Sequence, residues 1–125
     1  GVVGTAVVKA FDLTIAHTGL SEKQARALGY DAASAVIQAE SRAHYMPGHA
    51  PIHVKLVYEQ GSQRVLGAQM VGADGVAKRI DVVAAALHAG WTVADLAQLD
   101  LSYAPSFAPV WEPVMVAANV VGRET

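Results

Sequence analysis

The chain contains no cysteine among its 125 residues. This absence excludes a disulfide framework, a thiolate metal site and a cysteine nucleophile within the chain. It is typical of proteins from reducing compartments, so we expect a cytoplasmic location. No apolar run approaches the ~18 residues of a membrane span, and the N-terminus lacks the basic region and apolar block of a signal peptide. The chain also lacks an initiator methionine, which suggests an excised fragment or a processed product.

Charged residues are scarce as well, at 16% of the chain against ~25% in an ordinary soluble domain. Apolar residues make up 53%, although a small domain needs polar residues to cover its large relative surface. We therefore expect part of the surface to be buried against another subunit or domain. An alanine-rich core is the alternative explanation of the same figures. A net charge of −2 gives no electrostatic case for nucleic acid or membrane as a partner.

The apolar pattern predicts one α+β domain over residues 1–125, and its first part is rich in strands. A short helix is expected there, with Ser21 as N-cap, Gln24 completing a capping box and Gly29 as the stop. A turn at residues 60–63 joins two strands in the clearest hairpin of the sequence. The expected strands are residues 13–16, 32–43, 53–58 and 64–71.

The second part of the chain is helical in pattern. From residue 76 the apolar spacing predicts a helix, with Asp74 as its N-cap, Gly90 as its stop and Arg79 on its polar face. Two further helices are expected at residues 93–99 and 114–121. Strands followed by helices indicate an antiparallel sheet with helices packed on one face.

A proline-rich segment at residues 102–113 holds three of the five prolines. Because proline restricts its own backbone and that of the preceding residue, this loop is stiff and presents aromatic side chains. Tyr103 lies at its start, and Tyr45 precedes a second turn at residues 46–48. A tyrosine hydroxyl can donate a proton to a developing anion. From the residues alone, simple packing of both rings is the favoured interpretation.

Two other patterns suggest sites only weakly. His49 and His53 lie four residues apart in extended chain, which separates their Cα atoms by roughly 13 Å, so we expect no metal site there, even with His44 nearby. The glycine-containing stretch 72–75 lacks the full dinucleotide-binding fingerprint. The residues by themselves reveal no complete active site.

Five stretches carry the most distinctive sequence of the chain, and they are residues 4–20, 43–48, 66–69, 75–81 and 103–114. Together and in order, they resemble the C-terminal dimerisation domain of FAD-dependent pyridine nucleotide-disulfide oxidoreductases. Members similar to glutathione reductase have a His-Pro-Thr motif where this chain has Tyr103, Ala104 and Pro105. The pattern is similar instead to coenzyme A disulfide reductases and the related NADH oxidases and persulfide or polysulfide reductases.

The resemblance implies a homodimer in which Tyr45 and Tyr103 reach the active site of the partner subunit. It also implies that FAD, NAD(P)H and the redox-active cysteine belong to the N-terminal domains of a larger parent enzyme. We therefore expect the isolated chain to bind neither cofactor and not to be catalytic. The parent is expected to reduce coenzyme A disulfide or persulfide. The alternatives are a purely structural dimerisation module of an NADH oxidase and a stand-alone small ligand-binding domain.

Overall fold

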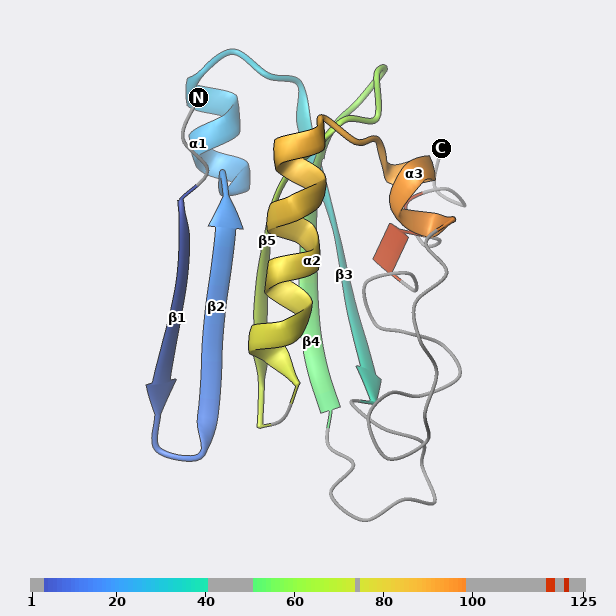
Figure 1. Cartoon of the computed structure of the whole chain (residues 1–125). Coiled ribbons are helices and arrows are strands. Elements are labelled where there is room, and N and C mark those ends of the chain that lie inside the picture. The colour runs from blue at the N-terminus through green and yellow to red at the C-terminus, as the bar shows by residue number, and fades with distance from the viewer. Residues whose placement is uncertain (1–3, 41–50, 74, 99–116, 119–120, 122–125) are drawn as a thin grey trace.

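The computed structural model describes residues 4–40, 51–73, 75–98, 117–118 and 121. They form a five-stranded antiparallel sheet and three helices (Figure 1). Within these residues, no helix combines the length and the apolar character needed to span a bilayer. In chain order, the elements are β1 (Thr5–Ala10), β2 (Leu13–Gly19), α1 (Glu22–Ala27), β3 (Ala32–Glu40), β4 (Pro51–Glu59), β5 (Val65–Gly72), α2 (Val76–Ala89) and α3 (Val93–Ala97).

The strand order in the sheet is β1-β2-β5-β4-β3, and every neighbouring pair is antiparallel. β5 thus lies at the centre, and β1 and β3 form the two edges. The longest helix, α2, runs along one face and packs chiefly over β5 and β2 (Figure 1). The predicted fold class, an antiparallel sheet with helices packed on one face, is confirmed, and the short helix α1 lies against one end of the other face.

Strand alternation divides the sheet into two faces. On β4, Ile52, Val54 and Leu56 are buried in the main core with α2, whereas His53 and Lys55 point to the opposite side. We call that opposite side the open face. Its members, by the strand register, are Ala6, Val8, Ala10, Leu13, Ile15, His17, Ser34, Val36, Gln38, His53, Lys55, Val57, Gly67, Gln69 and Val71.

The short helix α1 covers one end of the open face. Its Ala25 is buried with Val57 of β4 and Leu66 of β5 in a second, smaller core. The predicted capping box is confirmed, because the Ser21 side chain accepts from the Gln24 backbone and the Gln24 side chain accepts from the Ser21 backbone.

The beginning of α2 differs from the prediction. Its N-cap is Gly75, in the left-handed region at φ 74°, rather than Asp74, which lies outside the described residues. Arg79 is also not on a polar face, since only 1% of its surface is exposed. Its Nη1 donates a hydrogen bond of 2.9 Å to the carbonyl of Gly75. The first turn of α2 is therefore folded around the Arg79 side chain, and a side chain at the cap would occupy the same space.

The observed elements also differ from the predicted ones at β1 and α3. The edge strand β1 has no counterpart among the predicted strands, and a two-residue turn at Phe11 and Asp12 joins it to β2. α3 ends at Ala97 instead of residue 99 because Gln98 forms its C-cap. Of the helix expected at 114–121, residues 117, 118 and 121 are described, and they are helical.

Candidate functional site

The two expected site residues, Tyr45 and Tyr103, lie outside the described residues. The structure does describe the elements that hold the ends of both segments. β3 ends at Glu40 and β4 begins at Pro51, and these two residues pair directly in the sheet. Paired Cα atoms in an antiparallel ladder lie ~4.5–5.5 Å apart, so the two strand ends that flank the Tyr45 segment are adjacent in the sheet.

That point lies at the same end of the sheet as two other connections. Ile52 pairs with Gly72, and Gly72 pairs with Thr14, so the ends of β4, β5 and β2 lie side by side there. The β1–β2 turn and the connection from β5 to α2 therefore share this end with the end of β3 and the start of β4 (Figure 1). We call it the turn end of the sheet.

The described residues before and after the Tyr103 segment are buried in the main core. Before it, Leu96 of α3 is fully buried. After it, Ala117, Ala118 and Val121 are buried in the same cluster of side chains. The described residues that flank the Tyr103 segment are thus part of the main core, and those that flank the Tyr45 segment are paired in the sheet.

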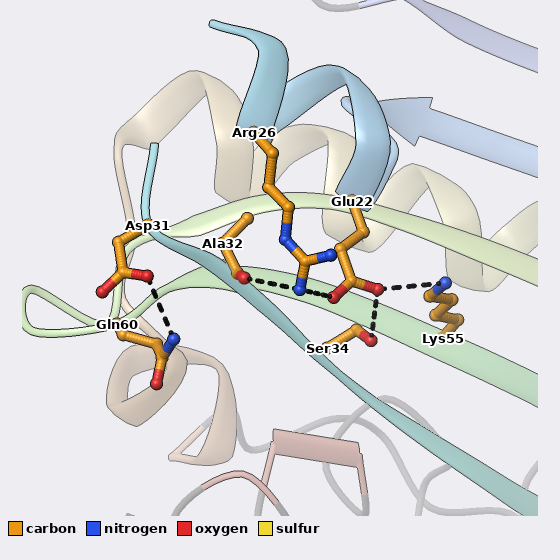
Figure 2. Close-up of polar contacts among 7 residues, drawn as sticks. All are labelled: Glu22, Arg26, Asp31, Ala32, Ser34, Lys55 and Gln60. Carbon is orange, nitrogen blue, oxygen red and sulfur yellow. Dashed lines mark hydrogen bonds and ion pairs between the residues drawn. The ribbon is translucent and has the colours of Figure 1, made fainter. Parts of the chain in front are cut away.

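A group of polar side chains fastens α1 to the open face (Figure 2). The Glu22 carboxylate accepts a hydrogen bond of 3.0 Å from the Ser34 hydroxyl on β3 and one of 2.6 Å from Arg26 on its own helix. The Lys55 ammonium on β4 lies 3.4 Å from the same carboxylate. Arg26 also donates to the carbonyl of Ala32 at 3.3 Å. One carboxylate therefore connects a helix to two strands.

The environment of Glu22 favours its ionised form. The hydrogen bond from Ser34 is the largest cause that lowers the pKa of Glu22, and the contacts with Lys55 and Arg26 lower it further, while partial burial opposes them. These contacts hold α1 against β3 and β4. Only the Glu22–Arg26 pair could have been predicted from sequence, from its four-residue helical spacing.

A shallow hollow of about 660 Å³ lies between α1, β2, β5 and the end of α2. His17, Arg64 and His88 line it, all with exposed side chains. It was not predicted from the sequence, because its walls come from four separate elements. Since these side chains already face solvent, the hollow gives no enclosed binding cavity within the described residues.

The weaker candidates of the sequence have ordinary surroundings. Within the described residues, no group of three or more His, Cys, Asp or Glu side chains could hold a metal ion. His53 is exposed on the open face, and His44 and His49 lie outside the described residues. A Cβ at Gly72 would lie 3.0 Å from the Ile52 side chain, so close packing accounts for that glycine.

Comparison with known proteins gives one consistent family. The sequence model described as "Pyridine nucleotide-disulphide oxidoreductase, dimerisation domain" matches residues 5–114. The NAD(P)H coenzyme A polysulfide/persulfide reductase of Pyrococcus horikoshii is 49% identical over 97% of this chain and 27% of its own length. Coenzyme A disulfide reductase of Staphylococcus epidermidis is 34% identical over 86% of this chain and 24% of its own length.

Solved structures agree with this assignment. A NAD-dependent persulfide reductase from A. fulgidus superposes with a TM-score of 0.96 and 46% identity, covering 99% of this chain and 23% of that one. A water-forming NADH oxidase from Lactobacillus brevis has a TM-score of 0.91 over 96% of this chain and 27% of its own, but at 22% identity it shows the fold alone. The chain thus spans about a quarter of the length of the relatives it matches. The resemblance predicted from the sequence is confirmed, and the chain belongs to the pyridine nucleotide-disulphide oxidoreductase family, of which it carries the dimerisation domain.

Proposed function

We propose that this domain forms a homodimer and completes the active site of the partner subunit in a cytoplasmic, NAD(P)H- and FAD-dependent reductase of coenzyme A disulfide or persulfide. The observation that carries the proposal is the 49% identity to a coenzyme A polysulfide/persulfide reductase over 97% of the chain. A similar identity of 46% to a persulfide reductase over 99% of the chain supports the same substrate class.

The chain supplies no redox centre of its own. It has no cysteine, and its glycines at 72 and 75 serve packing and helix capping. The flavin, the nicotinamide and the redox-active cysteine therefore have to come from another part of the parent polypeptide. When bound there, the flavin would carry electrons from NAD(P)H to a cysteine or disulfide centre.

Tyr45 and Tyr103 are the residues that we propose to act in that reaction. A phenol with an ordinary pKa near 10 is protonated at neutral pH and can donate its proton to a leaving thiolate. The resemblance of residues 43–48 and 103–114 to coenzyme A disulfide reductases is what supports this role.

The test is the double variant Tyr45→Phe/Tyr103→Phe in the full-length enzyme. We expect kcat for coenzyme A disulfide or persulfide to fall ~10²-fold or more, as for loss of a general acid, with flavin absorbance unchanged. The matched control is Tyr30→Phe, because Tyr30 packs against the α1 core and should leave kcat unaltered. Unchanged turnover in the double variant would remove both tyrosines from the mechanism.

A purely structural dimerisation module is the second candidate. The close superposition with a water-forming NADH oxidase at low identity favours it, since that fold is shared by relatives with different chemistry. In that case the double variant should weaken the dimer, measured by analytical ultracentrifugation, without a specific loss of kcat.

A further inference from the structure

Exposed apolar side chains are concentrated on one hairpin. Among the described residues, seven large apolar side chains are exposed, and five of them lie on β1, β2 and the turn between them. We call these five residues the apolar hairpin: Val7, Val8, Phe11, Leu13 and Ile15. The two that lie elsewhere are Leu28 and Val36.

The apolar hairpin is exposed on both of its faces. Val8 pairs with Ile15 on the open face, at 58% and 46% exposure. Val7 pairs with Ala16 on the face that carries α2, yet Val7 is 46% exposed whereas Ala16 is 1% exposed. The main core thus stops at β2. Strands that are apolar on both faces are typical of sheets covered on both sides.

Phe11, at the tip of the hairpin, has a backbone conformation and a side-chain exposure that are unfavourable in an isolated surface turn. Phe11 has a φ of 55°, a left-handed conformation that Gly or Asn normally occupies in two-residue turns. Its ring is fully exposed, at 100%. A turn that combines backbone strain with an uncovered ring indicates a functional contact for that ring.

The edge position of β1 points the same way. β1 ends the sheet on one side, and Lys9 is its only charged residue. Proteins protect edge strands from pairing with other chains by charges, bulges or a covering element, and a single lysine is the only such charge on β1. On the open face, Ile15 pairs with Val71 of β5, and Val71 pairs with His53 of β4. The apolar surface to be covered thus extends from the hairpin to Val71, where polar side chains begin.

We propose that the part of the parent polypeptide outside these 125 residues packs against both faces of the apolar hairpin and encloses Phe11. The inference rests on the proposed function, in which this chain is one domain of a larger reductase. In the P. horikoshii relative the matched region is 27% of the length, so most of such a polypeptide is available to form the covering surface.

The same domain of a second copy fits this surface less well. A two-fold symmetric contact brings one surface patch against its own copy and covers it from one side. The apolar hairpin exposes Val7 to one side, Val8 and Ile15 to the other, and Phe11 at the end. A cleft formed by other domains can enclose all three directions.

Photo-cross-linking in the full-length flavoenzyme tests the proposal. The variant Phe11→p-benzoylphenylalanine keeps an aromatic ring at the tip, and mass spectrometry identifies the peptide to which it attaches. We expect the attached peptide to come from outside residues 1–125. The control is the same substitution at Leu28, which is 68% exposed and outside the hairpin, and should give at least tenfold less product. Attachment to residues 1–125 of a second copy, or a yield no higher than at Leu28, would overturn the proposal.

A second variant keeps the test independent of the photoreactive group. Phe11→Asn removes the ring while suiting the left-handed turn, and Leu28→Asn is its control, because Leu28 is an exposed apolar side chain outside the hairpin. We expect Phe11→Asn alone to lower the melting temperature of the full-length enzyme while the dimer dissociation constant stays within twofold. A dissociation constant raised tenfold would instead assign the hairpin to the second copy. If the reading frame encodes no flavin-binding part, both this inference and the proposed function are overturned. If the full-length protein is a complete flavoenzyme but gives no cross-link, only this inference is overturned.

Discussion

The carboxylate of Glu22 on α1 accepts a 3.0 Å hydrogen bond from the hydroxyl of Ser34, twelve residues later on β3. Between them the chain completes α1, reverses at Gly29 and enters the strand. The contact therefore fixes the direction in which α1 lies on the open face. Lys55 of β4 approaches the same carboxylate from the neighbouring strand.

Loss of this contact should destabilise the domain modestly. We expect Glu22→Gln to lower the free energy of unfolding by about 1 kcal/mol, because the hydrogen bond involves a charged group but the side chain is 21% exposed. Urea denaturation measures the change, and a double-mutant cycle with Ser34→Ala isolates the pair. Asp81→Asn is the control, since Asp81 is an exposed carboxylate on α2. A coupling energy near zero would show that the two side chains do not interact in solution.

The same contact predicts a pH dependence. The pKa of Glu22 lies below its usual value of 4.5 in the folded chain, chiefly because Ser34 donates to the ionised form. A carboxylate with a depressed pKa stabilises the fold above its unfolded pKa and loses that contribution as pH falls through the folded value. We expect the stability difference between the native sequence and Glu22→Gln to be constant near neutral pH and to shrink below pH 4.5. A difference that persists in acid would contradict this assignment.

Substitution of Gly75, the N-cap of α2, should destabilise the domain more than Glu22→Gln does. Gly75 has a φ of 74°, and a Cβ there would lie 2.1 Å from Nη1 of Arg79. Gly75→Ala should therefore cost about 2–3 kcal/mol, combining left-handed strain with displacement of a buried guanidinium. Gly90→Ala is the matched control at the other end of α2, because its φ is 70° and nothing lies within 4 Å. We expect that control to cost about 1 kcal/mol, so equal losses by thermal unfolding would exclude a clash with Arg79.

Local signals were the part of the fold that the sequence could predict. The capping box at Ser21 and Gln24 and the stop at Gly90 depend on residues within one or two turns. The hairpin of β4 and β5 has clear alternation on one strand and a polar turn at residues 60–63. These features can be predicted because each is determined by residues that are close to it in the sequence.

The missed features depend on packing that short patterns do not contain. Residues 5–10 lack strand alternation because both faces of β1 are apolar. Arg79 looks like a surface residue at its helical position, but its side chain turns back to the Gly75 carbonyl. The two tyrosines were identified as candidate site residues only through the family resemblance, because neither spacing nor composition distinguishes a catalytic tyrosine from one that only packs. Tyr45 and Tyr103 stay predictions because both lie outside the described residues.

Gly67 of β5 should not tolerate a side chain, because backbone atoms of Leu20 occupy the space next to it. A Cβ at this position would lie 2.1 Å from the carbonyl oxygen of Leu20 and 2.7 Å from its backbone nitrogen. That nitrogen donates a 2.9 Å hydrogen bond to the Leu66 carbonyl, which attaches the start of the α1 segment to β5. Because backbone rather than a flexible side chain occupies the space, Gly67→Ala should force the two segments apart and cost about 3 kcal/mol. Gly4→Ala is the matched control, with nothing within 4 Å. Hydrogen exchange should show faster exchange of the Leu20 amide in Gly67→Ala alone, and equal protection in both variants would show that the chain accommodates the extra methyl group.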